Sequence, residues 1–201
     1  MKNFLRDSFK LIIILLLLQI LSFNSLYAAP NYIDQQLKNK LKQAFAEGLG
    51  FTDKFHAEVW LKDMATRLDA RFRGKFEMSK NQQYDFLTKV HNEATKAKLD
   101  PELVLSVIQV ESNFDKFAIS SAGARGLMQI MPFWLKEIGK PNDNLFDIST
   151  NLRFGCTILK YYLDIEKGNL TRALARYNGS LGRYTYPRKV YKALDRTWFK
   201  S

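Results

Sequence analysis

Residues 99–132, LDPELVLSVIQVESNFDKFAISSAGARGLMQIMP, decide the fold, and Glu111 lies near their centre. Asp100 followed by Pro101 predicts a helix start, because Asp can cap free amides and Pro suits the first turn. Three apolar residues share a helical face with Glu111: Val104, Val107 and Ile108. An acid that ends an apolar face is desolvated, which favours its neutral form. Glu111 is therefore a candidate general acid, with a solvated or salt-bridged carboxylate as the alternative.

The residues after this helix are small and include two glycines. Residues 118–126 read AISSAGARG, a composition that favours a tight loop whose backbone a ligand can approach closely. A second helix is expected to begin around Leu127.

Three motifs together carry a family resemblance. Glu111-Ser112 is followed by AISSAGARGLMQ at 118–129 and by ALARYN at 173–178. In this order they resemble the soluble lytic transglycosylase (SLT) family of peptidoglycan-cleaving enzymes. That family often continues the third motif with Ala-Gly, whereas this chain reads GSLG at 179–182. The motifs cover about residues 100–178, and we expect the resemblance to extend to Leu194.

The resemblance implies a lysozyme-like helical fold for about residues 84–198 and a specific chemistry. In the family, one acid protonates the leaving sugar and then takes a proton from the C6 hydroxyl of N-acetylmuramic acid (MurNAc). That hydroxyl closes a 1,6-anhydro ring, while the acetamido group of the same sugar stabilises the cation. Glu111 matches this acid, and Ser120, Gln129 and Tyr177 match residues that line the sugar cleft. Gln129 can instead brace the loop, and Tyr177 can be a core residue.

Ordinary glycosidases need a second carboxylate, and the candidates for that role are Asp115, Asp147 and Asp164. Asp115 follows Glu111 by one turn only if the helix continues beyond Asn113. Asp147 precedes a helix and suits a capping role, and Asp164 lies at salt-bridge spacing from Lys160. None of the three is a convincing nucleophile.

The chain begins with features of an export signal. Lys2, Arg6 and Lys10 precede an apolar run over residues 11–23, and Leu26-Tyr27-Ala28 offers a small residue for cleavage. We expect residues 1–28 to be a signal peptide and the mature protein to be periplasmic or associated with the cell envelope. No stable membrane span is expected after cleavage, and a retained anchor is the alternative.

Composition agrees with an exported, single-domain protein, and its basic charge indicates an acidic partner, with ordinary solubility as the alternative. The full sequence has a net charge of +11. Residues 1–28 contribute +2, which leaves +9 for the residues that follow. The scattered cations and the export signal argue against nucleic acid, and peptidoglycan strands, with carboxylates on their peptide stems, fit better. Cys156 is expected to be a buried small residue. His56 and His91 lie outside the motifs, and no metal or other cofactor is predicted.

The rest of the chain predicts helices, so the expected fold class is all-α. A lysozyme-like domain over 80–201 is expected to follow an N-terminal helical segment over 29–79, which either packs on it or binds a partner. The expected helices cover 33–45, a stretch after Thr52 and Asp53, a stretch from Ser79 towards Lys98, 152–165 capped by Ser149, 171–177 and 190–199.

Three functions remain open at this point. The first is a lytic transglycosylase that cleaves peptidoglycan without water. The second is a hydrolytic muramidase or chitinase of related fold, and the third is a non-catalytic wall-binding protein. Glu111 together with all three motifs argues against the third.

Overall fold

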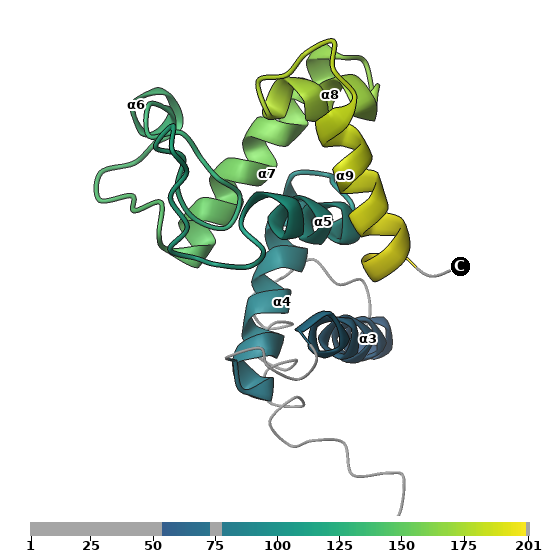
Figure 1. Cartoon of the computed structure of the whole chain (residues 1–201). Helices are drawn as coiled ribbons and strands as arrows, with labels where there is room; N and C mark the ends of the chain where they lie inside the picture. The colour runs from purple at the N-terminus through teal and green to yellow at the C-terminus, as the bar shows by residue number, and fades with distance from the viewer. Residues whose placement is uncertain (1–53, 73–77, 200–201) are drawn as a thin grey trace, which may run out of the picture. The chain divides into compact units, whose positions relative to one another are not determined.

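The computed structural model describes residues 54–72 and 78–199 (Figure 1). In this part of the chain the α-helices are α3 (Lys54–Phe72), α4 (Lys80–Lys96), α5 (Pro101–Glu111), α6 (Trp134–Ile138), α7 (Ile148–Ile165), α8 (Leu170–Tyr177) and α9 (Thr185–Ala193). A π-helical turn, η1 (Leu194–Trp198), follows α9 directly. The described residues include no β-strand, so the all-α prediction is confirmed. The expected signal peptide and the expected helix over 33–45 lie outside the described residues.

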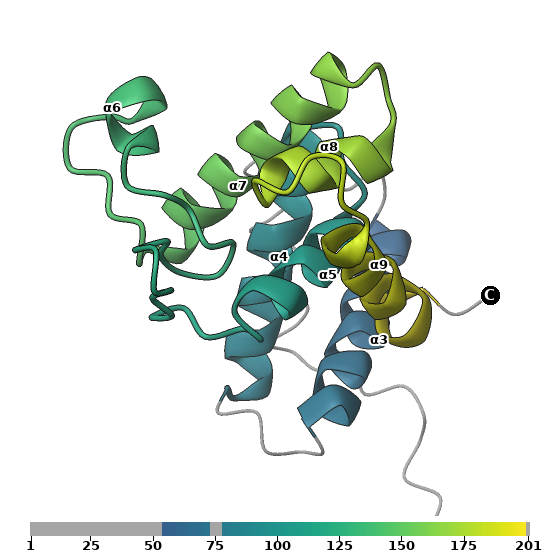
Figure 2. The ribbon, with the colours of Figure 1, turned by 45° about the horizontal axis from the view of Figure 1, so that its top comes forward.

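Helix α5 is the central helix of the core. Residues 103–108 are all buried, and five of these six residues are apolar, so burial is not confined to the predicted face. The polar member, Ser106, donates its hydroxyl to the Glu102 carbonyl at 2.7 Å. Figure 2 shows α5 between α4 and α9, and it contacts both helices as well as η1. Asp100 is the N-cap residue, but its side chain makes no capping hydrogen bond with the described backbone. Burial therefore fixes this helix more than its cap does.

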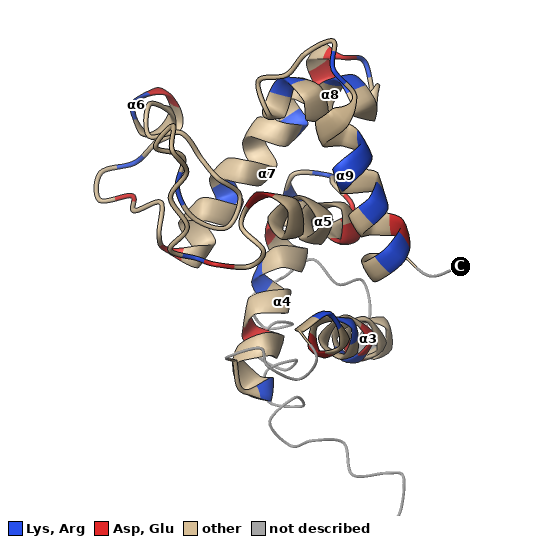
Figure 3. Ribbon diagram, viewed as in Figure 1, with Lys and Arg blue, Asp and Glu red and all other residues tan. Residues whose placement is uncertain are grey.

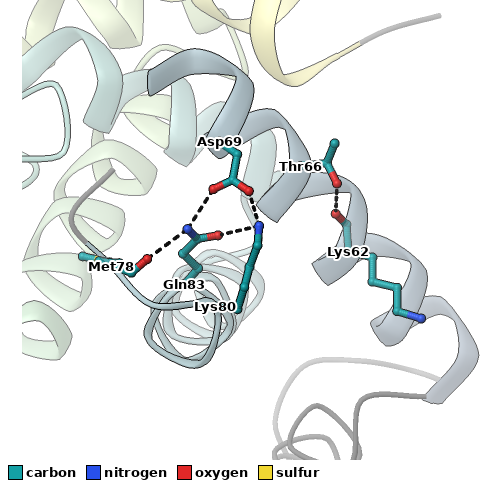
Figure 4. A network of polar contacts seen from close by, with 6 residues as sticks. All are labelled: Lys62, Thr66, Asp69, Met78, Lys80 and Gln83. Carbon is teal, nitrogen blue, oxygen red and sulfur yellow. Dashed lines mark hydrogen bonds and ion pairs between the residues drawn. The ribbon is translucent and has the colours of Figure 1, made fainter. Parts of the chain in front are cut away.

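Helix α3 packs on α4 and η1, and a polar network holds the α3–α4 joint (Figure 4). The Gln83 amide nitrogen donates to Asp69 Oδ1 at 2.9 Å and to the Met78 carbonyl at 3.2 Å. Lys80 forms an ion pair with the same Asp69 carboxylate. Gln83 is buried, so these bonds satisfy an amide that would otherwise be costly to bury. The described part of the 29–79 segment thus packs on α4 and η1.

An aromatic cluster fixes the turn that follows α5. Phe114 is buried, and its ring centroid lies 5.8 Å from Phe72, 6.0 Å from Phe86 and 5.6 Å from Trp198. These rings come from α3, α4 and η1. Edge-to-face and tilted aromatic pairs at such distances are favourable, so the chain is held firmly where α5 ends at Glu111.

Several helix boundaries differ from the sequence predictions. Ser79 caps α4 as predicted, but α7 is capped by Asp147, which accepts a bond from the Thr150 amide at 2.8 Å, and not by Ser149. The expected helix around Leu127 is wrong, because residues 124–130 form tight turns with isolated bridges from Arg125 to Ile119 and Ile130. The expected helix over 190–199 begins earlier, at Thr185, and ends in η1.

None of the described helices combines the length and apolar character that crossing a bilayer requires. Cys156 is buried, as predicted.

Candidate active site

Glu111 ends α5 and receives a hydrogen bond from α9. Its side chain is partly buried, and the Tyr186 hydroxyl donates to Glu111 Oε1 at 2.7 Å. Tyr186 itself is only 6% exposed. It shares a buried face of α9 with Val190 and Ala193, so the packing of α9 on α5 brings the hydroxyl to the carboxyl. The carboxyl is thus held in place yet partly open to solvent.

Burial changes the acidity of this carboxyl. Desolvation raises the pKa of Glu111 from 4.5 to about 7, against the Tyr186 hydrogen bond and the Lys189 charge, which both lower it. Burial also raises the pKa of Tyr186 well above 10, so its hydroxyl stays a neutral donor. Near neutral pH, Glu111 can therefore both give and accept a proton.

The loop beside Glu111 is tied to the end of α5. The Ser112 hydroxyl lies 2.8 Å from the Leu127 carbonyl and 3.2 Å from the Ile108 carbonyl. Gly126 has a φ of +74°, and a Cβ there would lie 2.5 Å from the Leu145 carbonyl oxygen. Only glycine fits that position, which explains the glycine in the second motif.

Buried Asn151 on α7 forms hydrogen bonds with the backbone of the same loop. Its Oδ1 accepts a bond from the Met128 amide at 2.8 Å, and its Nδ2 donates to the carbonyls of Arg125 and Leu145 at 2.9 and 2.7 Å. One side chain therefore satisfies three backbone groups of two loop segments. Sequence analysis did not select Asn151, because an asparagine at the start of a helix has many roles.

Ser120 and Gln129 lie in this loop and brace it. Ser120 Oγ accepts a bond from the Ala124 amide at 3.0 Å. The Gln129 amide nitrogen donates to the carbonyls of Ala118 and Gly126 at 3.2 and 3.0 Å, and its backbone has a φ of +51°. The bracing alternative for Gln129 is thus seen directly. Its amide oxygen accepts no bond from a described residue, and the Ser120 hydroxyl can still donate, so substrate contact stays a prediction for both.

Tyr177 on α8 joins the loop to the region around Glu111. Its hydroxyl donates to the Met128 carbonyl at 2.7 Å. Burial raises the pKa of Tyr177 well above 10, and the Glu111 charge adds to the shift. Tyr177 therefore senses the Glu111 charge, while its hydroxyl is bound to the loop. A substrate contact would use its ring.

The three carboxylates considered as a second acid all have other partners. Asp115 Oδ1 accepts a bond from the Phe117 amide at 2.8 Å, and Asp147 caps α7. Asp164 forms an ion pair with Lys160. Among the described residues, Tyr186 is the side chain that bonds Glu111. This arrangement leaves Glu111 as the candidate proton-transferring carboxyl.

The structure also bears on metal binding. The described residues contain no group of three or more His, Cys, Asp and Glu side chains that could hold a metal ion. The His91 ring lies 5.0 Å from the Trp60 ring, and burial lowers the pKa of His91 to about 4. This histidine belongs to a packed aromatic contact.

Sequence analysis missed Tyr186, which lies 75 residues after Glu111 and outside the three motifs. One signal could have found it. Tyr186, Val190 and Ala193 recur at helical spacing, which predicts that Tyr186 faces the core. Which residue its hydroxyl meets depends on helix packing.

Comparisons with known proteins place the chain in a family. Residues 89–199, more than half of the chain, match the family model "Transglycosylase SLT domain". A transglycosylase of Enterobacteria phage PRD1 is 36% identical over 104 residues, which cover 48% of this chain and 38% of the phage protein. An inactive mutant of the lytic transglycosylase Slt from Pseudomonas aeruginosa is a structural match with a TM-score of 0.44 and 18% identity, covering 80% of this chain and 32% of that one. This chain thus spans well under half the length of either relative. On the family-model match, the chain belongs to the transglycosylase SLT domain family.

Proposed function

We propose that this protein is a peptidoglycan lytic transglycosylase. It cleaves the β-1,4 bond between MurNAc and N-acetylglucosamine (GlcNAc) and leaves a 1,6-anhydroMurNAc end. The observation that carries the proposal is the environment of the Glu111 carboxyl. Burial raises the pKa of Glu111 to about 7, and the Tyr186 hydroxyl donates to Glu111 Oε1 at 2.7 Å. Asp115, Asp147 and Asp164 each bond another group of the protein. These contacts support a mechanism with one protein acid.

In the first half of the reaction, protonated Glu111 gives its proton to the glycosidic oxygen. The bond from C1 of MurNAc to that oxygen breaks, and the GlcNAc end leaves as an alcohol. The substrate's own acetamido oxygen stabilises the positive charge at C1. A carboxyl that is protonated near neutral pH suits this step, because general acids work best with a pKa near the working pH.

In the second half, the Glu111 carboxylate takes the proton of the MurNAc C6 hydroxyl. The C6 oxygen then bonds to C1 and closes the anhydro ring, which restores the protonated acid. The Tyr186 hydroxyl donates to the carboxylate between the two halves and keeps it oriented. Ser120, Gln129 and Tyr177 are proposed to contact the sugars beside Glu111.

The remaining parts of the proposal concern organisation and location. We propose that residues 80–201 form the catalytic domain, that residues 29–79 form a segment packed on it, and that residues 1–28 direct export to the cell envelope. The net charge of +9 beyond residue 28 favours an acidic polymer. Peptidoglycan strands are therefore the proposed partner.

Product analysis tests this function. Mature protein is incubated with purified sacculi in ¹⁸O-water, and the soluble muropeptides are separated and weighed by mass spectrometry. The proposal predicts anhydro ends without solvent oxygen, from native protein and not from a Glu111→Gln control. Reducing MurNAc ends that carry ¹⁸O would show hydrolysis and establish the muramidase alternative. Binding of sacculi without any product would establish the non-catalytic alternative.

A further inference from the structure

A pocket lies between α5, the end of α3 and the α9–η1 segment. It has a volume of about 290 Å³, and its lining includes four cationic side chains and no acid. These cations are Arg71, Lys189, Lys192 and Arg196. Figure 3 shows repeated positive positions along α9, and the turn that follows carries one acidic and one basic position, Asp195 and Arg196. The pocket is therefore strongly positive in a small volume.

The cations of this pocket are available to a ligand. Elsewhere on α3, Lys62 and Arg67 form ion pairs with Glu58 and Asp63. By contrast, none of the four pocket cations forms an ion pair with an acid in the described part of the chain. All four are exposed. Four like charges that line one pocket repel one another, and an anion would relieve that repulsion.

Two polar contacts give the pocket a fixed shape. Arg71 Nη2 donates to Asn113 Oδ1 at 2.7 Å, which ties this cation to the turn after Glu111. Gln109 Oε1 accepts a bond from Trp198 Nε1 at 2.9 Å. The Gln109 amide NH₂ is then left as a neutral donor for a ligand oxygen.

The pocket shares the last turn of α5 with the proposed acid. Gln109 and Val110, which line it, directly precede Glu111 in α5. Lys189 follows Tyr186 by one turn of α9, and its charge acts on Glu111. A ligand that extends from the cleavage site along α9 would reach the pocket.

We propose that this cationic pocket binds the carboxylates of the peptide stem that peptidoglycan carries next to the cleaved bond. The inference rests on the proposed function and names the part of the substrate that this site reads. Stem peptides hang from the lactyl group of MurNAc and carry free carboxylates, which Lys and Arg recognise through charge-assisted hydrogen bonds. The enzyme would thereby prefer strands with intact stems over bare glycan.

Other anionic ligands fit the pocket less well. Single-stranded nucleic acid is usually held by aromatic rings between cations, and no aromatic residue lines this pocket. Helices that bind a membrane surface usually have an exposed apolar face. The exposed face of α9 is cationic instead and lines the pocket.

A binding experiment tests the inference. The variant K192Q/R196Q removes two pocket cations, and the control K136Q/K167Q removes two exposed lysines that do not line the pocket. Calorimetry measures the affinity of each mature protein for soluble MurNAc-tetrapeptide and for the same peptide with amidated carboxyls. We expect native protein and control to bind the free-acid peptide alike, and K192Q/R196Q to bind about tenfold more weakly, since each exposed charge contact is modest. Native protein should bind the amidated peptide more weakly than the free-acid peptide, by the same factor.

Cleavage assays then separate this inference from the proposed function. K192Q/R196Q should cleave stem-bearing strands with a KM about tenfold higher and should cleave amidase-stripped strands at the native rate. Equal affinity of all three proteins for the free-acid peptide would overturn the inference even if cleavage occurs. Binding that depends on Lys192 and Arg196 but selects phosphatidylglycerol vesicles over the peptide would also overturn it. A protein that binds the peptide through these residues but cleaves neither strand would refute the proposed function and leave the pocket assignment standing.

Discussion

The Tyr186 hydroxyl donates a 2.7 Å hydrogen bond to Glu111 Oε1 and so joins α9 to the last residue of α5. Burial raises the pKa of Glu111 to about 7, and this bond acts in the opposite direction. Burial and this hydrogen bond together therefore set the fraction of Glu111 that is protonated near neutral pH. The proposed chemistry needs both forms in turn, so the balance between burial and this bond is central to it.

Tyr186→Phe should change the pH dependence of activity. Loss of the donor removes a contact that favours the carboxylate, so the pKa of Glu111 should rise above its native value of about 7. The alkaline fall of kcat/KM, which reports ionisation of the free acid, should therefore move to higher pH. The maximal rate should fall at the same time, because the carboxylate is less well oriented.

A tyrosine on the same helix provides the control for this experiment. The Tyr191 hydroxyl lies 2.8 Å from Thr171 Oγ1 and does not bond Glu111. Tyr191→Phe should keep the native pH profile. An alkaline limb that stays in place in Tyr186→Phe would mean that the hydrogen bond does not tune Glu111.

Asn151→Asp should loosen the loop beside Glu111. The change keeps the shape of the side chain, but it replaces the Nδ2 donor of two bonds and buries an acid that faces two carbonyls. We expect the free energy of unfolding to fall by about 3 kcal/mol, a cost typical of a broken buried polar network. Thermal and urea unfolding measure this change.

The matched control is Asn169→Asp, at the exposed N-cap of α8. Asn169 uses only its side-chain oxygen, which accepts a bond from the Arg172 amide at 3.1 Å. Aspartate can make the same bond, so this variant should keep native stability. Equal stability losses at both positions would contradict the account of the Asn151 donors.

Glu111→Gln should alter how stability depends on pH. The folded protein holds the Glu111 proton more tightly than the unfolded chain, with a pKa of about 7 against 4.5. Between these values, stability therefore falls as pH rises, and the cost is fully present above pH 7. The glutamine variant has no such cost. Its free energy of unfolding relative to native protein should rise by about 2 kcal/mol from pH 4.5 to 7.5, allowing for the partial exposure of Glu111.

Urea unfolding of both proteins at each pH gives this difference directly. Every other titrating group is shared, so the difference isolates the contribution of residue 111. A difference that does not change with pH would show that burial leaves the acidity of Glu111 unaltered.

Local signals in the sequence predicted much of the fold. The Ser79 cap, the Asp100-Pro101 start and the apolar residues before Glu111 act within a few positions, so helices α4 and α5 and the burial of Glu111 could be expected. Ser149 was the wrong cap, because Asp147 can also cap and sits where the helix begins. The helix expected around Leu127 was wrong for a different reason. Asn151, which is distant in sequence, satisfies the loop backbone in a non-helical form.

The candidate site was predictable only in part. The motifs predict that Gln129 and Tyr177 line the sugar cleft, and this stays a prediction. Their bonds to the Gly126 and Met128 carbonyls come from folded geometry. Tyr186 lies beyond the motifs and meets Glu111 through the packing of α9 on α5. Contacts between residues so far apart in sequence depend on tertiary packing, which spacing along one helix does not encode.

The most direct test of the account is the turnover of sacculi by Glu111→Gln, measured beside its melting temperature and its sedimentation with sacculi. Glutamine keeps the shape of the side chain and removes the transferable proton. The account predicts a loss of at least about a hundredfold in rate, as expected for a missing general acid, with wall binding unchanged and a melting temperature no lower than native. A variant that folds, binds the wall and keeps more than about a tenth of the native rate would contradict the account, because Glu111 could not then be the group that transfers the proton.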